Sequence, residues 1–306
     1  MARRNARTVN GILLLDKPLD ISSNGILQRV RWLYQAKKAG HTGALDPMAS
    51  GLLPLCFGEA TKFSQFLLDT DKTYQVEARF GIRTSTSDAE GEVISTKPVQ
   101  HNQAQLEQAM QAFRGDILQV PTMFSALKYQ GQPLYRYARQ GITVPREARP
   151  ISIYRFELVS FTPEVASFIV HCSKGTYIRT LIDDLGEALG CGAHVSALHR
   201  TQVGPFDIKQ AYKVPIIEQA TLACHDSKDF SAVDGLLLPM DAGLVGFGQM
   251  QLTFAEQQKI QHGQSFETGL ENCAAIKLYN ADQQFLGLGQ INEGILSSRR
   301  LLNTAS

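Results

Sequence analysis

The sequence lacks the motifs by which most metal and cofactor enzymes are recognised. None of its five cysteines form a Cys-x-x-Cys pair, and its histidines form no His-x-x-x-His pair. It contains no Gly-x-x-x-x-Gly-Lys-Ser/Thr loop, no Gly-x-Gly-x-x-Gly fingerprint and no Gly-x-Ser-x-Gly elbow. These absences argue against a zinc site, against bound ATP or NAD, and against a serine nucleophile.

Long apolar runs and an excess of charge are missing as well. The run Gly11–Leu15 is too short for a membrane span or for the apolar core of a signal peptide. Together with the odd number of cysteines, this favours a cytoplasmic protein without membrane contact. The formal net charge is only +1, so the global charge does not indicate a nucleic-acid-binding protein.

Positive charge is nevertheless concentrated in two segments. Residues 1–38 contain eight Lys and Arg against two Asp, and residues 124–150 contain five against one Glu. A local phosphate-binding surface requires such segments, although an ordinary solvated surface can have the same composition.

The chain has 306 residues, 43% of them hydrophobic, which suits one large domain and one small one. Apolar patterns predict strands at 11–15, 74–80, 151–161 and 167–172, and helices after Ser22 or Ser23 and at 59–68, 106–113 and 177–189. This mixture indicates an α+β fold. We expect a boundary within 238–249, separating a domain of residues 1–240 from a small β-rich module of residues 241–306.

Residues 123–150 interrupt the regular pattern. They contain two glycines, three prolines and three tyrosines, and their periodicity is weak. We therefore expect an insertion that projects from the core and carries the second basic segment.

One acid stands out among turn-forming residues. Asp46 lies in residues 40–51 (GHTGALDPMASG), where glycines give conformational freedom and Pro47 biases Asp46 toward an extended conformation. Such a carboxylate is either a displayed reactive group or the acid of an Asx-type turn that caps backbone amides.

Five ordered motifs carry a specific resemblance. They are Lys17-Pro18 with Ser22-Ser23, the Asp46 loop, Lys72-Thr73-Tyr74, residues 131–139 (GQPLYRYAR) and residues 174–179 (KGTYIR). Over residues 10–205 the chain resembles the TruB family of tRNA pseudouridine synthases, and the module at 241–306 is weakly similar to a PUA domain. The resemblance implies a pseudouridine synthase catalytic domain with a mixed, largely antiparallel sheet. It also implies an RNA-gripping thumb at 123–150 and a β-rich, PUA-like C-terminal domain.

The resemblance also implies a reaction. The substrate would be the uridine at position 55 in the T loop of tRNA, bound through the T stem-loop. Separately, nothing in the sequence suggests more than a monomer. The C1′–N1 bond would be cut, the uracil rotated and rejoined through C5, without metal or cofactor because the isomerisation is redox-neutral. The alternatives are a guide-RNA-dependent relative acting on rRNA and a non-catalytic tRNA-binding or chaperone protein.

The same resemblance assigns roles to residues. Asp46 would attack either the sugar C1′ or the base, and Arg179 would keep it ionised in a dry pocket. Without the motif, Arg179 could equally pair with Asp183 one turn along a helix. Tyr74 would stack on the flipped base and help remove the C5 proton, although a strand tyrosine is more commonly plain core. Four further residues are assigned to the substrate pocket, where turn, core or strand-end roles are the alternatives: His41, Tyr177, Leu198 and Lys17.

Overall fold

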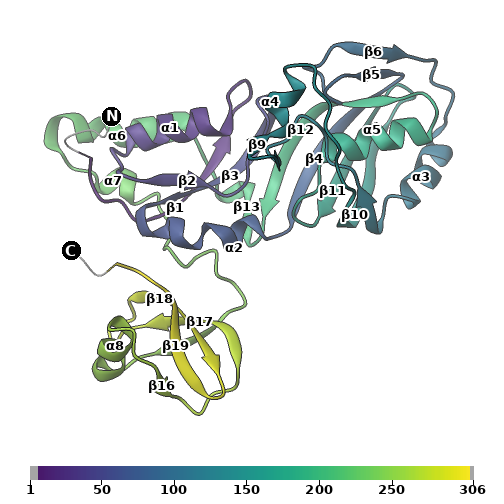
Figure 1. Ribbon diagram of the computed structural model, residues 1–306. Helices are drawn as coiled ribbons and strands as arrows, with labels where there is room; N and C mark the ends of the chain where they lie inside the picture. The colour runs from purple at the N-terminus through teal and green to yellow at the C-terminus, as the bar shows by residue number, and fades with distance from the viewer. Residues whose placement is uncertain (1–5, 304–306) are drawn as a thin grey trace.

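The computed structural model describes residues 6–303, apart from the side chains of residues 223 and 225–227. It contains a ten-stranded sheet, a five-stranded sheet and two short ribbons (Figure 1). The strands are β1 Gly11–Lys17, β2 Ala39–His41, β3 Ala49–Phe57, β4 Lys72–Phe80, β5 Ile82–Thr84, β6 Val93–Thr96, β7 Gly115–Gln119, β8 Lys128–Tyr129, β9 Gln132–Pro133, β10 Arg149–Phe161, β11 Val165–Cys172, β12 Ala193–Val203, β13 Phe206–Asp207, β14 Tyr212–Lys213, β15 Gly248–Gln251, β16 Phe266–Glu267, β17 Cys273–Tyr279, β18 Phe285–Asn292 and β19 Ile295–Leu301. The helices are α1 Ser23–Leu33, α2 Ser64–Leu68, α3 Gln103–Gln111, α4 Leu134–Ala138, α5 Ile178–Ala188, α6 Val214–Ser227, α7 Ser231–Asp234 and α8 Phe254–Gln261, with 3₁₀ turns η1 Gly58–Phe63 and η2 Ile208–Gln210.

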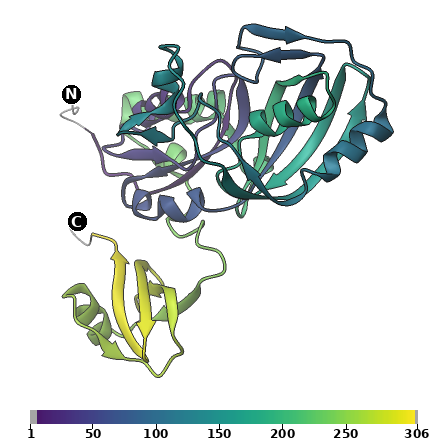
Figure 2. The same cartoon turned by 45° about the vertical axis from the view of Figure 1, so that its right-hand side comes forward.

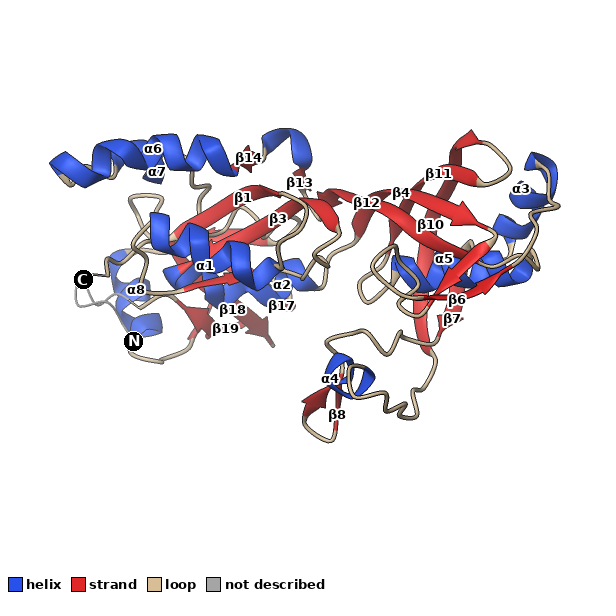
Figure 3. Cartoon of the chain, turned by 90° about the horizontal axis from the view of Figure 1, so that it is seen from above, coloured by secondary structure: helices blue, strands red, loops and turns tan. Residues whose placement is uncertain are grey.

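The large sheet has the order β14-β1-β3-β12-β4-β11-β10-β7, with β2 on β3 and β13 on β12. All its pairs are antiparallel except β1–β14 and β3–β12, which confirms the predicted mixed, largely antiparallel α+β fold. Helices α1, α6 and α7 contribute to the core of the β1–β3 half, and α3 and α5 to that of the β4–β11 half. Figure 3 shows β12 running between the two halves.

The two halves meet in a short parallel pair between β3 and β12. Ala49, Ser50 and Gly51 lie opposite residues 198–200. Gly51 has φ +102°, and a Cβ there would lie 2.3 Å from the carbonyl oxygen of Arg200, so only glycine permits this approach. The Asp46 loop enters β3 at this joint, and the joint therefore fixes where the loop lies.

The predicted helices form with small changes in their ends. Ser22 caps α1 by accepting a hydrogen bond from the Gly25 amide, which decides between the two candidate serines. The segment predicted as helical at 59–68 is helical, but its first part is the 3₁₀ turn η1 and only its end is the short α-helix α2. Thr61 and Ser64 hydroxyls donate to the carbonyls of Gly58 and Thr61, a local bonding that competes with regular helix.

The C-terminal sheet has the order β15-β17-β18-β19-β16. It lies beside η1 and α2, the helical segment between β3 and β4, and shares an apolar cluster with them (Figure 2). Phe63 stacks edge-on against Phe285, with ring centroids 5.3 Å apart. Lys62 Nζ donates to the carbonyl of Leu301 at 2.9 Å. The module is β-rich, as predicted, while the boundary at 240/241 stays a prediction.

The segment 123–150, called the thumb below, contains the β8–β9 ribbon and α4, which stand away from the sheet in Figure 3. Its basic side chains Lys128, Arg136, Arg139 and Arg149 are exposed, and Arg146 is half-buried. Helices long and apolar enough to cross a membrane are absent from residues 6–303.

Candidate active site

Asp46 lies in a loop of residues 42–48 between β2 and β3, shorter than the predicted 40–51 because both ends belong to strands. Its side chain is 40% exposed, and Oδ2 lies 3.0 Å from Arg179 Nη2. The Ala49 amide donates to the Asp46 main-chain carbonyl, and no described backbone amide donates to the carboxylate. The alternative of an amide-capping Asx turn is therefore wrong.

Side chains from two other elements hold this loop. Ser23 of α1 bonds both polar groups of the Leu45 main chain, donating to the carbonyl at 2.9 Å and accepting from the amide at 2.7 Å. Arg200 of β12 donates to the Gly43 carbonyl at 3.0 Å. The carboxylate is thus presented by a braced loop rather than a free one.

Arg179 lies at the start of α5 and contacts two carboxylates. Besides Asp46, it pairs with Asp88 at 3.2 Å, and it donates to the carbonyls of Thr86 and Phe124 at 3.2 and 2.9 Å. Asp88 is itself buried and accepts a hydrogen bond from the Thr86 hydroxyl. Asp88 was not predicted from the sequence, where only its place in a Ser/Thr-rich turn marks it.

The alternative pairing of Arg179 with Asp183 is wrong. Asp183 instead accepts from Arg83 Nε at 2.7 Å and from the Ser87 hydroxyl at 3.0 Å. Arg179 is therefore directed into the site and not along the helix surface.

A cavity of about 380 Å³ opens beside Asp46. It is within the size range of small-molecule pockets and is bounded by the Asp46 loop, the base of the thumb and residues 173–179. Five of the seven predicted site residues line it: Asp46, Tyr74, Tyr177, Arg179 and Leu198. The fold thus brings together residues that are up to 152 positions apart in the sequence.

The other two predicted residues, Lys17 and His41, are not part of this lining. Lys17 lies fully buried beneath the loop, where Nζ donates to the carbonyls of Pro18 and Ala49, each at 2.7 Å. Burial lowers the pKa of Lys17 to about 8, against the opposing effect of Asp46. His41 ends β2, and its Nδ1 is buried without a hydrogen-bond partner among the described residues.

Burial raises the pKa of Asp46 above its ordinary value, because the walls of the site disfavour a charged carboxylate. The Arg179 guanidinium is the strongest opposing influence, and Asp88 adds to the upward shift. The ionisation of Asp46 therefore depends on Arg179.

Lys72 lines the cavity, and its burial leads us to expect that the stability of the protein changes with pH. It is 8% exposed, its Nζ donates to the Leu68 carbonyl at 2.7 Å, and burial lowers its pKa to about 8 from 10.5. Between these two values the unfolded state binds more protons than the folded state, so the Lys72 contribution to the free energy of unfolding rises with pH. Against Lys72→Met, the wild type should gain about 2–3 kcal/mol between pH 7 and pH 10.

Urea unfolding of both proteins at the two pH values checks this prediction. Lys97→Met, at an exposed lysine, serves as the control and should give a pH-independent difference. An unchanged difference for Lys72→Met would show that Lys72 is not desolvated in the fold.

A second cavity, of about 460 Å³, lies on the opposite face of the sheet. Gln75 and Glu77 line it, and they alternate along β4 with Tyr74. Asp46 and Arg179 do not reach it, so we place the candidate site in the smaller cavity. No cluster of three or more potential metal ligands occurs in the described part of the chain.

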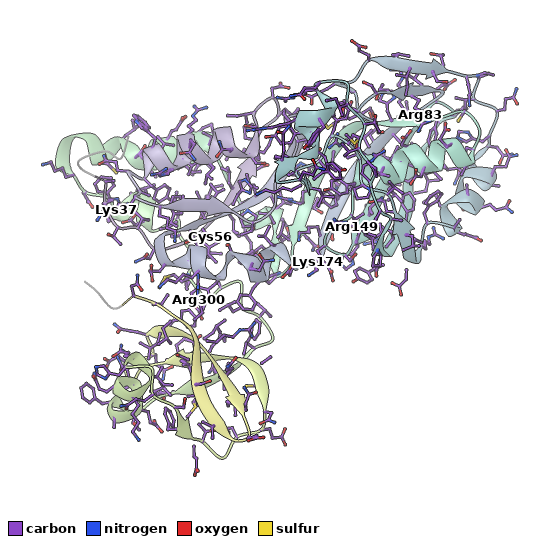
Figure 4. All side chains as sticks on the ribbon, viewed as in Figure 1. Lys37, Cys56, Arg83, Arg149, Lys174 and Arg300 are labelled. Atoms are coloured by element: carbon purple, nitrogen blue, oxygen red, sulfur yellow. The ribbon has the colours of Figure 1, made fainter. Side chains whose placement is uncertain are left out.

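The two basic segments differ in the structure. Arg7 pairs with Asp234 and Arg29 with Glu218, so two of the eight cations in residues 1–38 are neutralised within the fold. Arg3 and Arg4 lie outside the described residues. Figure 4 shows Lys37 at the far end of the β1–β3 half. Two cations of the N-terminal segment are thus paired within the fold, whereas the thumb keeps exposed cations; phosphate binding by either segment stays a prediction.

Comparisons with known proteins agree with this architecture. Residues 31–178 match the model of the TruB family pseudouridylate synthase N-terminal domain. Residues 179–245 match a tRNA pseudouridylate synthase B C-terminal domain, and residues 248–302 match the C-terminal domain of pseudouridine synthase II TruB.

Curated relatives match over the full length. The chain is 50% identical to a tRNA pseudouridine synthase B of Psychromonas ingrahamii, over 99% of this chain and all of the relative. It is 51% identical to the protein of the same name from Haemophilus influenzae, over 99% of each chain.

Solved structures share the fold at lower identity. A chain of an H/ACA RNP bound to a substrate RNA containing 2′-deoxyuridine has a TM-score of 0.73 at 20% identity, covering 96% of this chain and 86% of that one. A chain of a Cbf5–Nop10–Gar1 complex has a TM-score of 0.72 at 22% identity, covering 97% and 91%.

Proposed function

The chain belongs to the TruB family of pseudouridine synthases, and from this premise we propose that it converts uridine 55 in the T loop of tRNA to pseudouridine. It is then an isomerase that acts on tRNA, like the relatives whose names describe that activity. The observation that carries the proposal is the Asp46 carboxylate paired with buried Arg179 at a cavity that also holds Tyr74.

The proposed chemistry begins with the ionised Asp46 carboxylate, which forms a covalent bond to the sugar C1′ or to the base. The C1′–N1 bond breaks, the uracil turns, and C5 bonds to C1′. When Asp46 is bonded to C1′, the new C5–C1′ bond displaces the carboxylate; when it is bonded to the base, the carboxylate leaves after that bond has formed. C5 then loses its proton and N1 gains one. Atoms and electrons balance without an oxidant or reductant, so the reaction needs no cofactor.

The uridine must leave the stacked T loop before it can react, at a cost of a few kcal/mol. Stacking on an aromatic ring returns about 1–3 kcal/mol, and we assign this role to Tyr74, which is buried at the cavity wall. Tyr177 and Leu198 would contact the uracil from the remaining walls. His41 would fill the space left by the base or contact the RNA loop, and Lys17 would support the pocket through the Asp46 loop.

We further propose a cytoplasmic monomer that binds the T stem-loop with the thumb and with residues 241–306. The cysteines support a reducing compartment, since all five are free and four are buried. The two alternative functions are less well supported. The resemblance to RNP structures lies below 25% identity and concerns the fold, and a non-catalytic binder would not require the Asp46–Arg179 pair.

The direct test uses wild-type protein and an isolated T stem-loop transcript with uridine tritiated at C5. We expect tritium release without any guide RNA or protein partner, because the site contains its own nucleophile and base-binding walls. Product that forms only after a guide RNA is added would favour the guide-dependent alternative. Binding without product under all conditions would favour the non-catalytic one.

The thumb gives a second prediction. We propose that Arg136 and Arg139 bind phosphate, because neither forms an ion pair with an acidic side chain of the described residues. Reversing both charges to Glu should weaken tRNA binding and reduce the slope of log K against log salt by about one for each phosphate that the thumb no longer neutralises. Filter binding across a salt series measures this slope.

The control is Arg155→Glu on β10, outside the thumb, which should leave the slope unchanged. An unchanged slope in the thumb variant would mean that this segment does not touch phosphate.

A further inference from the structure

Arg200 is a buried cation that the proposed chemistry leaves without a role. It is 1% exposed and is the largest fully buried side chain of the described residues. Its guanidinium donates to two main-chain carbonyls, those of Leu52 at 2.8 Å and Gly43 at 3.0 Å, and no carboxylate that the structure describes forms an ion pair with it. A charge buried among neutral partners is costly, so packing alone is a poor reason for an arginine here.

Arg200 lies between Tyr74 on the neighbouring strand and the loop that carries Asp46. It lies directly opposite Tyr74 in the antiparallel pair of β12 and β4, and a register shift follows it between Arg200 and Gln202. Bulges of this kind re-aim side chains next to active sites. Both residues line the cavity, and the positive charge of Arg200 favours the ionised form of the Tyr74 phenol. Burial raises the pKa of Tyr74 against this effect.

The second contact of Arg200 reaches the nucleophile loop. The Gly43 carbonyl that it binds lies three residues before Asp46, and Gly43 has φ +110°. Arg200 therefore binds the main chain that carries Asp46 and lies opposite the residue proposed to stack on the base.

From these contacts, and resting on the proposed function, we propose that Arg200 is a positioning residue of the isomerisation. It braces the Asp46 loop from the position opposite Tyr74 on the neighbouring strand, and so holds the nucleophile and the stacking ring in one relative position. Arg200 Nε and Nη2 reach the carbonyls of Leu52 and Gly43 from one rigid plane, a geometry that a lysine ammonium on its flexible stem does not reproduce. The other buried cation nearby, Lys72 on β4, donates to the carbonyls of Leu68 and Thr70 and so does not hold the Asp46 loop.

The test measures the T stem-loop Kd and the single-turnover rate constant separately. The proteins are wild type, Arg200→Met, Arg200→Lys, Tyr74→Phe and the double variant Arg200→Met/Tyr74→Phe. We expect Arg200→Met to lower the rate constant by about 10- to 100-fold, the scale of a hydrogen bond to a charged group, with Kd changed by less than about twofold. Arg200→Lys should recover little of this loss. The double variant should lose at least about fivefold less than the product of the two single losses.

His194→Gln is the matched control. His194 is also buried on β12, and its Nδ1 shares a hydrogen bond of 2.8 Å with the Ile82 carbonyl away from the cavity. Combined with Tyr74→Phe, it should show multiplicative effects. Circular dichroism and thermal melting report the folding of every variant.

Three results would overturn the inference. They are multiplicative losses for Arg200→Met and Tyr74→Phe, a loss confined to Kd, and unfolding of both Arg200 variants, which would make the residue purely structural. Inactive wild-type protein that still binds the RNA would instead refute the proposed function, so the two failures are distinguishable.

Discussion

Asp46→Asn is expected to abolish pseudouridine formation while the protein stays folded and binds tRNA. The amide keeps the shape of the side chain but cannot form the covalent bond, so the rate should fall by about 10⁴-fold or more, as for other removed nucleophiles. The fold should tolerate the change because Asp46 is part-exposed and Arg179 keeps its second partner, Asp88, at 3.2 Å.

Tritium release from the labelled T stem-loop measures the loss, and filter binding measures Kd. Asp69→Asn is the matched control, since its side chain is 43% exposed and pairs with Lys174 at 2.9 Å. It removes a carboxylate of similar exposure from outside the cavity lining, and activity should stay near that of wild type. Full activity in Asp46→Asn would refute the assignment of the nucleophile.

The sequence predicts much of this site because its residues lie in contiguous motifs. Tyr74 follows Lys72 and Thr73 at the start of an alternating strand, and Arg179 follows a glycine turn that opens an amphipathic helix. Both features are local, so they can be recognised before the fold is known.

Two central strands were not predicted, for reasons of burial. In β3 nearly every residue is buried, so apolar and polar positions do not alternate. In β12 the buried positions include His194 and Arg200, which disguise the pattern of an inner strand. The sequence therefore predicts strands with one exposed face, such as β4, better than the fully buried β3 or the irregular β12.

Two other pairs of distant residues were not predicted. Asp88 meets Arg179 across 91 positions, and Arg7 meets Asp234 across 227. The local sequence around each residue does not indicate its partner. The second pair neutralises Arg7, one of the cations that the composition assigned to a local phosphate-binding surface.

Arg179→Met is expected to cause the second large loss. The substitution removes the strongest influence that opposes the upward shift in the pKa of Asp46, and a smaller share of the carboxylate is then ionised at neutral pH. The single-turnover rate should fall by about 10²–10³-fold, the scale for removing a fixed electrostatic partner from an active site. Arg83→Met is the control, because Arg83 pairs with Asp183 and Glu187 on the same helix away from the cavity.

The stability of Arg179→Met should also fall, by about 3–5 kcal/mol, because buried Asp88 is left without its partner. Adding Asp88→Asn removes that uncompensated charge. The double variant should regain most of the free energy of unfolding, measured in urea, without regaining activity. This separates the structural contribution of Arg179 from its effect on Asp46.

The pH dependence then identifies how Arg179 acts. Asp46 must be ionised to attack, so activity rises with pH through the pKa of Asp46, and loss of Arg179 moves that rise to higher pH. The loss in the double variant should accordingly be larger at pH 6 than at pH 8.5. Equal losses at both values would mean that Arg179 orients Asp46 or the RNA without controlling its charge.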